Sequence, residues 1–295
     1  MSLKVLWKAS RPPFLILTPI IVMLGIALAS YQGYPISHWR VWLVICGALA
    51  AHIAVNSLNE YQDFCSGLDL QTSRTPFSGG SGALPDNPHM AHNVLMLSMF
   101  SVLLCVAIGI YLSLQTNWLL LPVGFVGLMV VVTYTKWLNQ RPWACLFSPG
   151  ASFGLLMMTG SYLVFSKGIT GQVLAIGLIP FFLINNLLLL NQLPDIEADR
   201  QAGRRTLPID KGVKFAVTIY FLFNVMACGV LMLLVMAGWL PGLSLIALLG
   251  FIPAGIATTV GAKWGGQIGE HPAYLAANVL AALLVPALLA GSLLY

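Results

Sequence analysis

Charged residues are scarce in this chain, and their scarcity argues against a soluble globular protein. Only 8% of its 295 residues are Asp, Glu, Lys or Arg, whereas 58% are hydrophobic and the mean hydropathy is +0.87. Soluble domains carry about 25% charged residues. Apolar stretches of about 20 residues, the length that crosses a bilayer, recur along the whole sequence. The composition therefore predicts a polytopic membrane protein.

Long hydrophilic stretches and paired cysteines are also missing. No polar stretch is long enough for a separate soluble domain, so we expect one domain over residues 1–295, with its longest polar connections at about 59–92 and 193–214. The five cysteines occur singly, without a CxxC pair or a Cys/His pair at metal-ligand spacing. This pattern excludes a cysteine-based metal site and predicts small buried hydrophobic side chains.

The apolar stretches predict an all-α fold with about nine transmembrane helices in a bundle around a central cavity. The expected spans are 13–31, 39–58, 93–114, 117–135, 143–166, 173–192, 215–238, 240–262 and 273–294. The first span follows a basic segment, as a secretory signal does. It has full membrane length and no small-residue cleavage pattern before a soluble region, so we expect a retained helix.

Basic residues fall almost entirely on one side of these nine spans. Only Arg40 and Lys167 lie on the other side. Lys and Arg close to span ends stay cytoplasmic, which predicts a cytoplasmic amino terminus. The residues on the predicted cytoplasmic side are Lys4, Lys8, Arg11, Arg74, Lys136, Arg141, Arg200, Arg204, Arg205, Lys211, Lys214 and Lys263.

Most of the nine acidic residues lie in two short stretches, each at the end of an apolar segment. One stretch runs from Asn56 to Asp69 and the other from Asn191 to Asp199. Asn59 and Asp63 are four residues apart, as are Asp195 and Asp199, so each pair shares one helical face. Carboxylates placed in this way repel each other, and a divalent cation would compensate them.

The ligand types in these stretches favour magnesium. Oxygen ligands from Asp, Glu and Asn, without His or Cys, suit hard Mg²⁺ rather than zinc or copper. Mg²⁺ typically takes only one or two carboxylates and completes its shell with water and substrate phosphate. The candidate metal ligands are Asn59, Glu60, Asp63, Asp195 and Asp199.

Basic residues near both acidic stretches indicate a diphosphate ligand. Arg74, Lys136, Arg141, Arg204 and Arg205 are the candidates that could reach an anion shared between the two stretches. The positive-inside rule alone explains many of them. The group attached to the diphosphate should be apolar, because a membrane-embedded bundle can offer it only an apolar tunnel.

The sequence resembles the UbiA superfamily of intramembrane aromatic prenyltransferases over the whole chain. That family has two aspartate-rich motifs, NDxxD with a further Asp, and DxxxD followed by a Gly and a basic-Thr-Leu segment. The first is similar to Asn59-Glu60-Tyr61-Gln62-Asp63 with Asp69. The second is similar to Asp195 through Asp199, continued by Gly203-Arg204-Arg205-Thr206-Leu207. Trp7 to Pro12 and Tyr134-Thr135-Lys136 also resemble family features, and the closest branch makes menaquinone from 1,4-dihydroxy-2-naphthoate.

The resemblance implies Mg²⁺-dependent transfer of a prenyl group from an isoprenyl diphosphate to a small aromatic acceptor, at a cytoplasmic-facing site in a bacterial or archaeal inner membrane. It implies neither a nucleic acid nor an obligate protein partner. Asp63, Asp195 and Asp199 would act through the metal, with Tyr134 stabilising an allylic cation, Lys136 contributing to catalysis, and Asp69 deprotonating the acceptor. The implied diphosphate-binding residues are Arg11, Asn56, Arg74, Lys136, Arg141, Arg204 and Arg205.

Three departures from the family pattern leave the acceptor open. Glu60 stands where Asp is usual, a longer carboxylate that can still bind Mg²⁺. The segment 74–82, with Gly79-Gly80-Ser81-Gly82, replaces an Arg-Pro-Leu type of loop, and its glycines fit either a phosphate-cradling lid or a flexible connector. Asn191 to Pro194 differs from the Asn-x-x-Arg-Asp of the naphthoate branch.

Two other functions remain as alternatives. A terpene cyclase of the same fold would quench the cation internally and need no acceptor. A secondary transporter would place ionisable residues near the bilayer midplane on broken helices, and acids at helix ends argue against it.

Overall fold

The computed structural model describes residues 2–70, 72 and 74–295, and within them it is all-helical, without strands. The amino-terminal half of the chain forms α1 (Ser2–Ala9), α2 (Pro12–Leu15), α3 (Leu17–Tyr31), α4 (His38–Ser66), η1 (Leu68–Leu70), α5 (Ala83–Asp86), η2 (Pro88–Met90), α6 (Ala91–Gln115), α7 (Leu120–Thr133) and η3 (Leu138–Gln140). The remainder forms α8 (Pro142–Gly150), η4 (Ala151–Met157), α9 (Met158–Leu163), α10 (Gly171–Asn191), α11 (Ile196–Gln201), α12 (Leu207–Lys211), α13 (Val213–Met236), η5 (Gly242–Gly250), α14 (Phe251–Trp264), η6 (Gly265–Glu270) and α15 (Pro272–Leu294).

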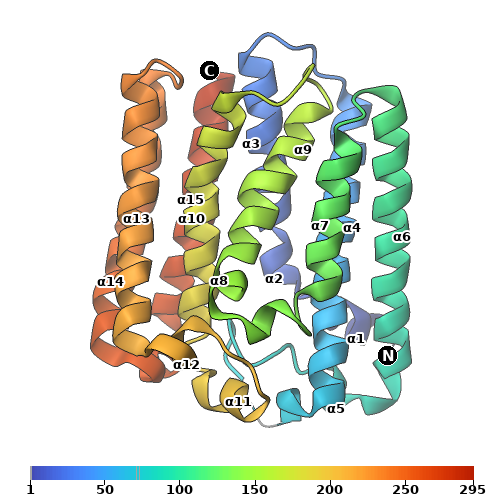
Figure 1. The fold of residues 1–295 in the computed structure, drawn as a ribbon, viewed down its shortest axis with the longest axis vertical. Helices are drawn as coiled ribbons and strands as arrows, with labels where there is room; N and C mark the ends of the chain where they lie inside the picture. The colour runs from blue at the N-terminus through green and yellow to red at the C-terminus, as the bar shows by residue number, and fades with distance from the viewer. Residues whose placement is uncertain (1, 71, 73) are drawn as a thin grey trace.

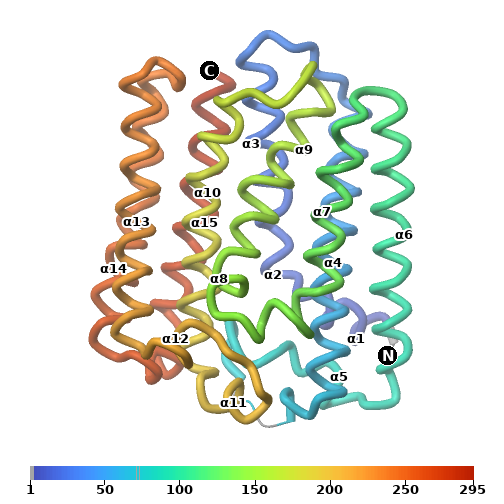
Figure 2. The backbone as a smooth tube through the Cα atoms, in the orientation of Figure 1, coloured from blue at the N-terminus to red at the C-terminus, as the bar shows by residue number. Residues whose placement is uncertain are grey.

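The long helices stand side by side as a bundle, and the short helices gather at one end (Figure 1). That end carries α1, α5, α11 and α12, whereas the carboxyl terminus lies at the opposite end. The backbone tube shows the long helices alternating in direction, so that α4 and α10 both descend toward the end that carries the short helices (Figure 2). Two segments that are far apart in the sequence therefore finish at the same face.

Among the described residues, seven helical segments are long and apolar enough to cross a membrane. They are Pro12–Tyr31, His38–Ser66, Pro88–Gln115, Gly171–Asn191, Val213–Met236, Gly242–Glu270 and Pro272–Leu294. The two other predicted spans fall on α7, which is shorter, and on the consecutive helices α8, η4 and α9. The prediction of a helical membrane protein is confirmed, whereas the count of nine spans and the cytoplasmic amino terminus stay predictions.

Large apolar side chains cover the outside of the bundle, as lipid contact requires. Phe100 of α6, Phe125 of α7 and Leu233 of α13 are all more than half exposed. Cys46 and Cys65 are exposed as well, and of the five cysteines only Cys145 is buried, so the expectation of buried cysteines was wrong for most of them. The error arises because an apolar residue on a membrane helix can face lipid instead of the core.

Polar side chains join the helices inside the bundle. Asn186 of α10 donates to the Tyr220 carbonyl of α13 at 2.8 Å, and the Tyr220 hydroxyl donates to Asn278 of α15 at 3.0 Å. Asn186 also donates to Asn224 at 3.0 Å, and Asn185 accepts a bond from the Gly150 amide at 2.7 Å. These bonds link α8, α10, α13 and α15 within the bundle, as polar side chains between membrane helices commonly do.

Candidate active site

The two acidic stretches meet at the end of the bundle that carries the short helices. Asn59 and Asp63 lie on the last turns of α4, which runs on past the predicted end at residue 58 and stops at Gly67, a left-handed cap with φ 80°. Asp195 caps α11 and Asp199 lies within that helix. The Asp199 amide bonds the Asp195 carbonyl at 2.8 Å, so one helical turn holds this pair.

Arg204 connects the two stretches. One guanidinium nitrogen contacts Asp199 at 2.9 Å and the other contacts Asp63. All three side chains are largely buried, with exposed fractions of 18% for Arg204, 7% for Asp63 and 4% for Asp199. The two carboxylates raise the pKa of Arg204 despite its burial, so the guanidinium stays charged between them.

Arg11 supplies a second cation from the opposite wall. It is the only non-glycine residue with positive φ among those the structure describes, at 52°, and it lies between α1 and α2. Its guanidinium donates to Asn59 Oδ1 at 3.1 Å, and Asn59 donates onward to Thr135 at 3.0 Å. Backbone strain of this kind costs about 1–3 kcal/mol and persists where the surroundings fix the residue, commonly at a functional site.

Burial raises the pKa of two acids at this face. The pKa of Asp69 rises to about 7, first through desolvation and then through the charges of Glu60 and Asp63. The pKa of Asp195 also rises to about 7, through desolvation and the charge of Asp199. Asp69 Oδ2 is buried without a hydrogen-bond partner among the described residues. Both carboxyl groups therefore bind a proton, or another positive charge, more readily than an exposed Asp does.

A cavity of about 430 Å³ extends from the acids into the bundle. Its polar end is lined by Arg11, Asn56, Asn59, Asp63, Asp69, Tyr134, Asp195, Asp199 and Arg204. Its remainder is lined mainly by aliphatic and glycine residues of α4, α6, α7, α9 and α10, such as Val55, Ile108, Gly127, Gly160 and Leu187. The cavity thus has a charged mouth and an apolar interior.

Four predicted diphosphate ligands lie outside this cavity. Lys136 is exposed, and Arg141 stacks on the Trp137 ring at 3.6 Å. Arg74 pairs with Asp86 at 3.0 Å, and Arg205 pairs with Asp210 at 3.1 Å. Glu60 also lies outside the lining, because its carboxylate is turned toward the segment 81–84. Arg11, Asn56 and Arg204 are the predicted diphosphate ligands that the structure brings together.

Three amide side chains of the lining escaped the sequence analysis as site residues: Asn139, Asn191 and Gln192. Asn191 and Gln192 are the first two residues of the second acidic stretch, so their position at a span end could have identified them. Asn139 lies in the short turn η3, where no spacing pattern marks it. The Asn191 Oδ1 atom is buried without a hydrogen-bond partner among the described residues.

The donor set fits Mg²⁺ shared with a substrate, although it does not form a closed protein cage. Within the described residues, no three His, Cys, Asp or Glu side chains converge at metal-binding distance. The available donors are carboxylate and amide oxygens, including the unpaired Asp69 Oδ2 and Asn191 Oδ1. Mg²⁺ prefers such oxygens and is usually held by one or two carboxylates together with phosphates and water.

The bundle is that of a helical membrane protein, and its cavity has a charged mouth and an apolar interior. The comparisons with known proteins identify its class as prenyltransferase. The model of the UbiA prenyltransferase family matches residues 18–267, so the chain belongs to this family. The chain is 31% identical over 220 residues to the 1,4-dihydroxy-2-naphthoate octaprenyltransferase of Bacillus subtilis, covering 73% of this chain and 68% of the relative.

More distant relatives share the family or the fold. The digeranylgeranylglyceryl phosphate synthase of Methanosphaera stadtmanae is 25% identical over 199 residues, covering 65% of this chain and 66% of the relative. A UbiA homologue from Archaeoglobus fulgidus, solved bound to DMAPP and Mg²⁺, aligns with a TM-score of 0.71 at 12% identity over 98% of each chain.

Proposed function

We propose that this enzyme transfers a prenyl group from an isoprenyl diphosphate to a small aromatic acceptor, favouring one that resembles 1,4-dihydroxy-2-naphthoate, in menaquinone synthesis. The observation that carries the proposal is the single cavity in which Arg11, Arg204 and the acids form the mouth and aliphatic side chains form the interior. Such a cavity matches a molecule with an anionic head and a hydrocarbon tail. The similarity to the Bacillus subtilis enzyme supports the choice of acceptor.

Four side chains would hold Mg²⁺ at the mouth: Asn59, Asp63, Asp195 and Asp199. Bound there, the metal supplies positive charge that neutralises the diphosphate leaving group. Arg11 and Arg204 line the same mouth and can donate to phosphate oxygens. Arg204 is held between Asp63 and Asp199 before any ligand arrives, so its charge is already oriented.

The reaction breaks the bond between the prenyl C1 and the diphosphate oxygen, and the electron pair leaves with the diphosphate. The face of Tyr134, in the cavity wall, stabilises the resulting allylic cation. The aromatic carbon of the acceptor then forms the new bond to C1 and loses its proton. Asp69 accepts that proton, since a carboxyl group with a pKa of about 7 is well matched to proton transfer near neutral pH.

We also propose that the mouth faces the cytoplasm of a bacterial or archaeal inner membrane. Lys8, Arg11, Arg200 and Arg204 belong to the face that carries the short helices. At the opposite end, Arg40 lies in the first turn of α4 and Lys167 lies in the connection between α9 and α10. Basic residues near span ends favour the cytoplasmic side. A diphosphate substrate and Mg²⁺ are both available from that side.

A product assay tests the proposal. Purified enzyme with Mg²⁺ receives prenyl diphosphates of several lengths together with naphthoate, with 4-hydroxybenzoate, or without acceptor, and mass spectrometry identifies the products. We expect a prenylated naphthoate and released diphosphate, both abolished in Asp63→Asn and Asp199→Asn. A cyclised hydrocarbon formed without acceptor would replace the transferase assignment with a cyclase, and unchanged turnover in both variants would refute the metal site.

A further inference from the structure

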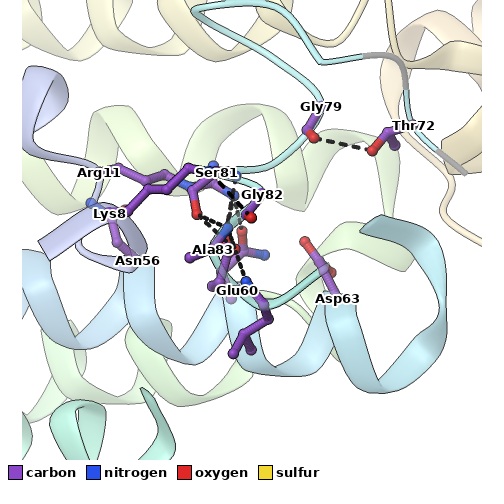
Figure 3. A network of polar contacts seen from close by, with 12 residues as sticks. Lys8, Arg11, Asn56, Glu60, Asp63, Thr72, Gly79, Ser81, Gly82 and Ala83 are labelled. Atoms are coloured by element: carbon purple, nitrogen blue, oxygen red, sulfur yellow. Dashed lines mark hydrogen bonds and ion pairs between the residues drawn. The ribbon is translucent and has the colours of Figure 1, made fainter. Parts of the chain in front are cut away.

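We propose that Glu60 is a positioning residue that fastens the glycine loop, defined here as residues 78–82, across the mouth of the cavity. Glu60 has no exposed surface, and its carboxylate points from α4 toward the loop (Figure 3). The effect of Glu60 on catalysis rests on the proposed function, whereas the effect of Glu60 on the loop does not. This role differs from that of a metal ligand, which the motif position alone would suggest.

Both carboxylate oxygens of Glu60 are committed to the loop and to the start of α5. Oε1 accepts from the Ser81 hydroxyl at 2.6 Å, from the Ala83 amide at 3.1 Å and from the Leu84 amide at 3.5 Å. Oε2 accepts from the Ser81 amide at 3.1 Å and also lies 3.7 Å from the Arg11 guanidinium, with which it forms an ion pair. A buried carboxylate with this many donors is satisfied, and turning it toward a cation would leave buried amides unpaired.

The loop in turn touches the second acidic stretch. The Gly79 amide donates to Asp195 Oδ2 at 3.0 Å, and the Gly79 carbonyl accepts from the Thr72 hydroxyl at 3.0 Å. The Gly82 carbonyl accepts from Lys8 of α1 at 3.2 Å. One segment therefore links α1, α4 and the cap of α11.

Glycine is required for this path. Gly79, Gly80 and Gly82 have φ values of 79°, 76° and 69°, in the left-handed region. A Cβ on Gly80 would lie 2.5 Å from Asp69 Oδ1, so the backbone rests directly on that carboxylate. Glycine-rich backbone is conformationally free in the absence of restraints. An anchor is needed to hold it in one conformation, and Glu60 supplies two bonds to Ser81 and two more to Ala83 and Leu84, directly after the loop.

A fastened loop closes the mouth on its aqueous side. Gly79 and Gly80 line the cavity beside Asp69 and Asp195. Excluding water from this position protects an allylic cation from hydrolysis to the prenyl alcohol. Releasing the loop should therefore divert substrate from transfer to hydrolysis, without removing the metal-binding oxygens of Asp63, Asp195 and Asp199.

Hydrogen exchange tests the anchor without substrate or Mg²⁺. In Glu60→Ala we expect amide exchange at Ser81 and Ala83 to accelerate at least about tenfold, because the bonds to a charged acceptor are lost. Glu60→Gln, which keeps the size of the side chain and one carbonyl oxygen, should give a smaller acceleration. Gln62→Ala, on the same helix, is the matched control and should leave both amides unchanged, because Gln62 Oε1 has no hydrogen-bond partner among the described residues. Exchange at wild-type rates in Glu60→Ala and Glu60→Gln would overturn the proposal.

Turnover tests the catalytic consequence. We expect Glu60→Ala to raise the ratio of prenyl alcohol to transferred product several-fold and to remain defective at saturating Mg²⁺. Ser81→Ala should produce a smaller rise alone and no further rise in the Glu60→Ala background, since both act through the same bonds. Restoration by added Mg²⁺ would instead assign Glu60 to the metal and overturn the proposal. If no variant or wild type transfers a prenyl group, the proposed function fails while the exchange result still stands.

Discussion

Arg204 shows how one side chain organises a site assembled from distant parts of the chain. Its contacts to Asp63 and Asp199 join residues that are more than a hundred positions apart. Three buried charges of mixed sign are stable only while they remain together, because an unpaired buried charge is costly. The neighbouring Arg205 is exposed and pairs only with Asp210. The two adjacent arginines therefore have different roles: Arg204 joins two buried carboxylates, whereas Arg205 forms an ion pair at the surface.

Replacing Arg204 should destabilise the protein and abolish transfer, whereas replacing Arg205 should do neither. Breaking a buried ion pair from one side costs about 3–5 kcal/mol. We expect Arg204→Ala to lower the unfolding temperature in detergent by several degrees and to show no diphosphate release. Arg205→Ala is the matched control. Equal unfolding temperatures for the two variants would show that the buried cluster does not stabilise the fold.

The pKa of Asp69 predicts a pH dependence of stability. Its folded pKa of about 7 lies above the ordinary value of 3.8, so the folded protein keeps a proton that the unfolded chain releases between these values. The free energy of unfolding should therefore fall as the pH rises from about 4 to about 7, by about 1.4 kcal/mol for each unit of pKa difference. Unfolding temperatures of magnesium-free protein, measured across this range, should decline.

Asp69→Asn is the control variant for the predicted fall in unfolding temperature with rising pH. The variant removes the contribution of Asp69 and leaves the shallower decline caused by Asp195, whose pKa is also about 7. Identical slopes in the variant and the wild type would mean that Asp69 does not titrate as its burial requires.

At the scale of helices, hydropathy predicted where segments lie better than where they end. Each of the nine predicted spans falls on one helix or on consecutive helical segments, as 143–166 does on α8, η4 and α9 and 240–262 does on η5 and α14. The end of α4 was placed at residue 58 because the apolar run stops there, yet the helix continues to Ser66. Asn, Glu and Gln continue a helix beyond lipid, and only the left-handed Gly67 stops it. Hydropathy reports contact with lipid, not the hydrogen bonds of the backbone.

The π-helical turn η4 could not be predicted from the sequence. Gly154 lies in it, and a Cβ there would be 2.4 Å from the Phe181 amide nitrogen and 2.7 Å from the Gly177 carbonyl of α10. The extra residue in the turn is associated with this close crossing of two helices, which depends on tertiary packing. In the site, the spacing of the acids made them predictable from the sequence. Which of the adjacent arginines, Arg204 or Arg205, contacts the acids also depends on tertiary packing, because it is set by how the loop after α11 folds back.

Gly127 of α7 should limit the length of the prenyl tail. It lines the cavity, a Cβ there would meet nothing within 4 Å, and it lies about 10 Å along the helix from Tyr134. We expect Gly127→Leu to reduce turnover of long prenyl diphosphates at least tenfold while short ones still react, since the side chain fills the path of the tail. Mass spectrometry of the products, formed from prenyl diphosphates of several lengths, measures this change in chain-length preference.

Gly229→Leu is the matched control for this substitution. Gly229 lies on α13 outside the cavity lining and is equally open, with nothing within 4 Å of an added Cβ. An unchanged chain-length profile in Gly127→Leu, or the same shift in both variants, would show that this part of the cavity does not hold the tail.

At the scale of the whole molecule, the charge distribution predicts its orientation in the membrane. Arg200 of α11 belongs to the end with the site, and Lys167 belongs to the connection between α9 and α10 at the other end. In a background without the native cysteines, Arg200→Cys should react with an impermeant maleimide only from the cytoplasm, and Lys167→Cys only from outside. The reverse labelling pattern would place the amino terminus outside and refute the assignment of the site to the cytoplasmic face.

The charged mouth and the apolar interior of the cavity also bear on what happens after the reaction. On the proposed function, diphosphate is released at an end that meets water, whereas the prenylated product has its hydrocarbon tail among helices that meet lipid. The two products thus leave into different phases and seldom encounter each other again. Reversal would require both to return together, so partitioning between phases drives the transfer forward in addition to the chemistry of the broken bond.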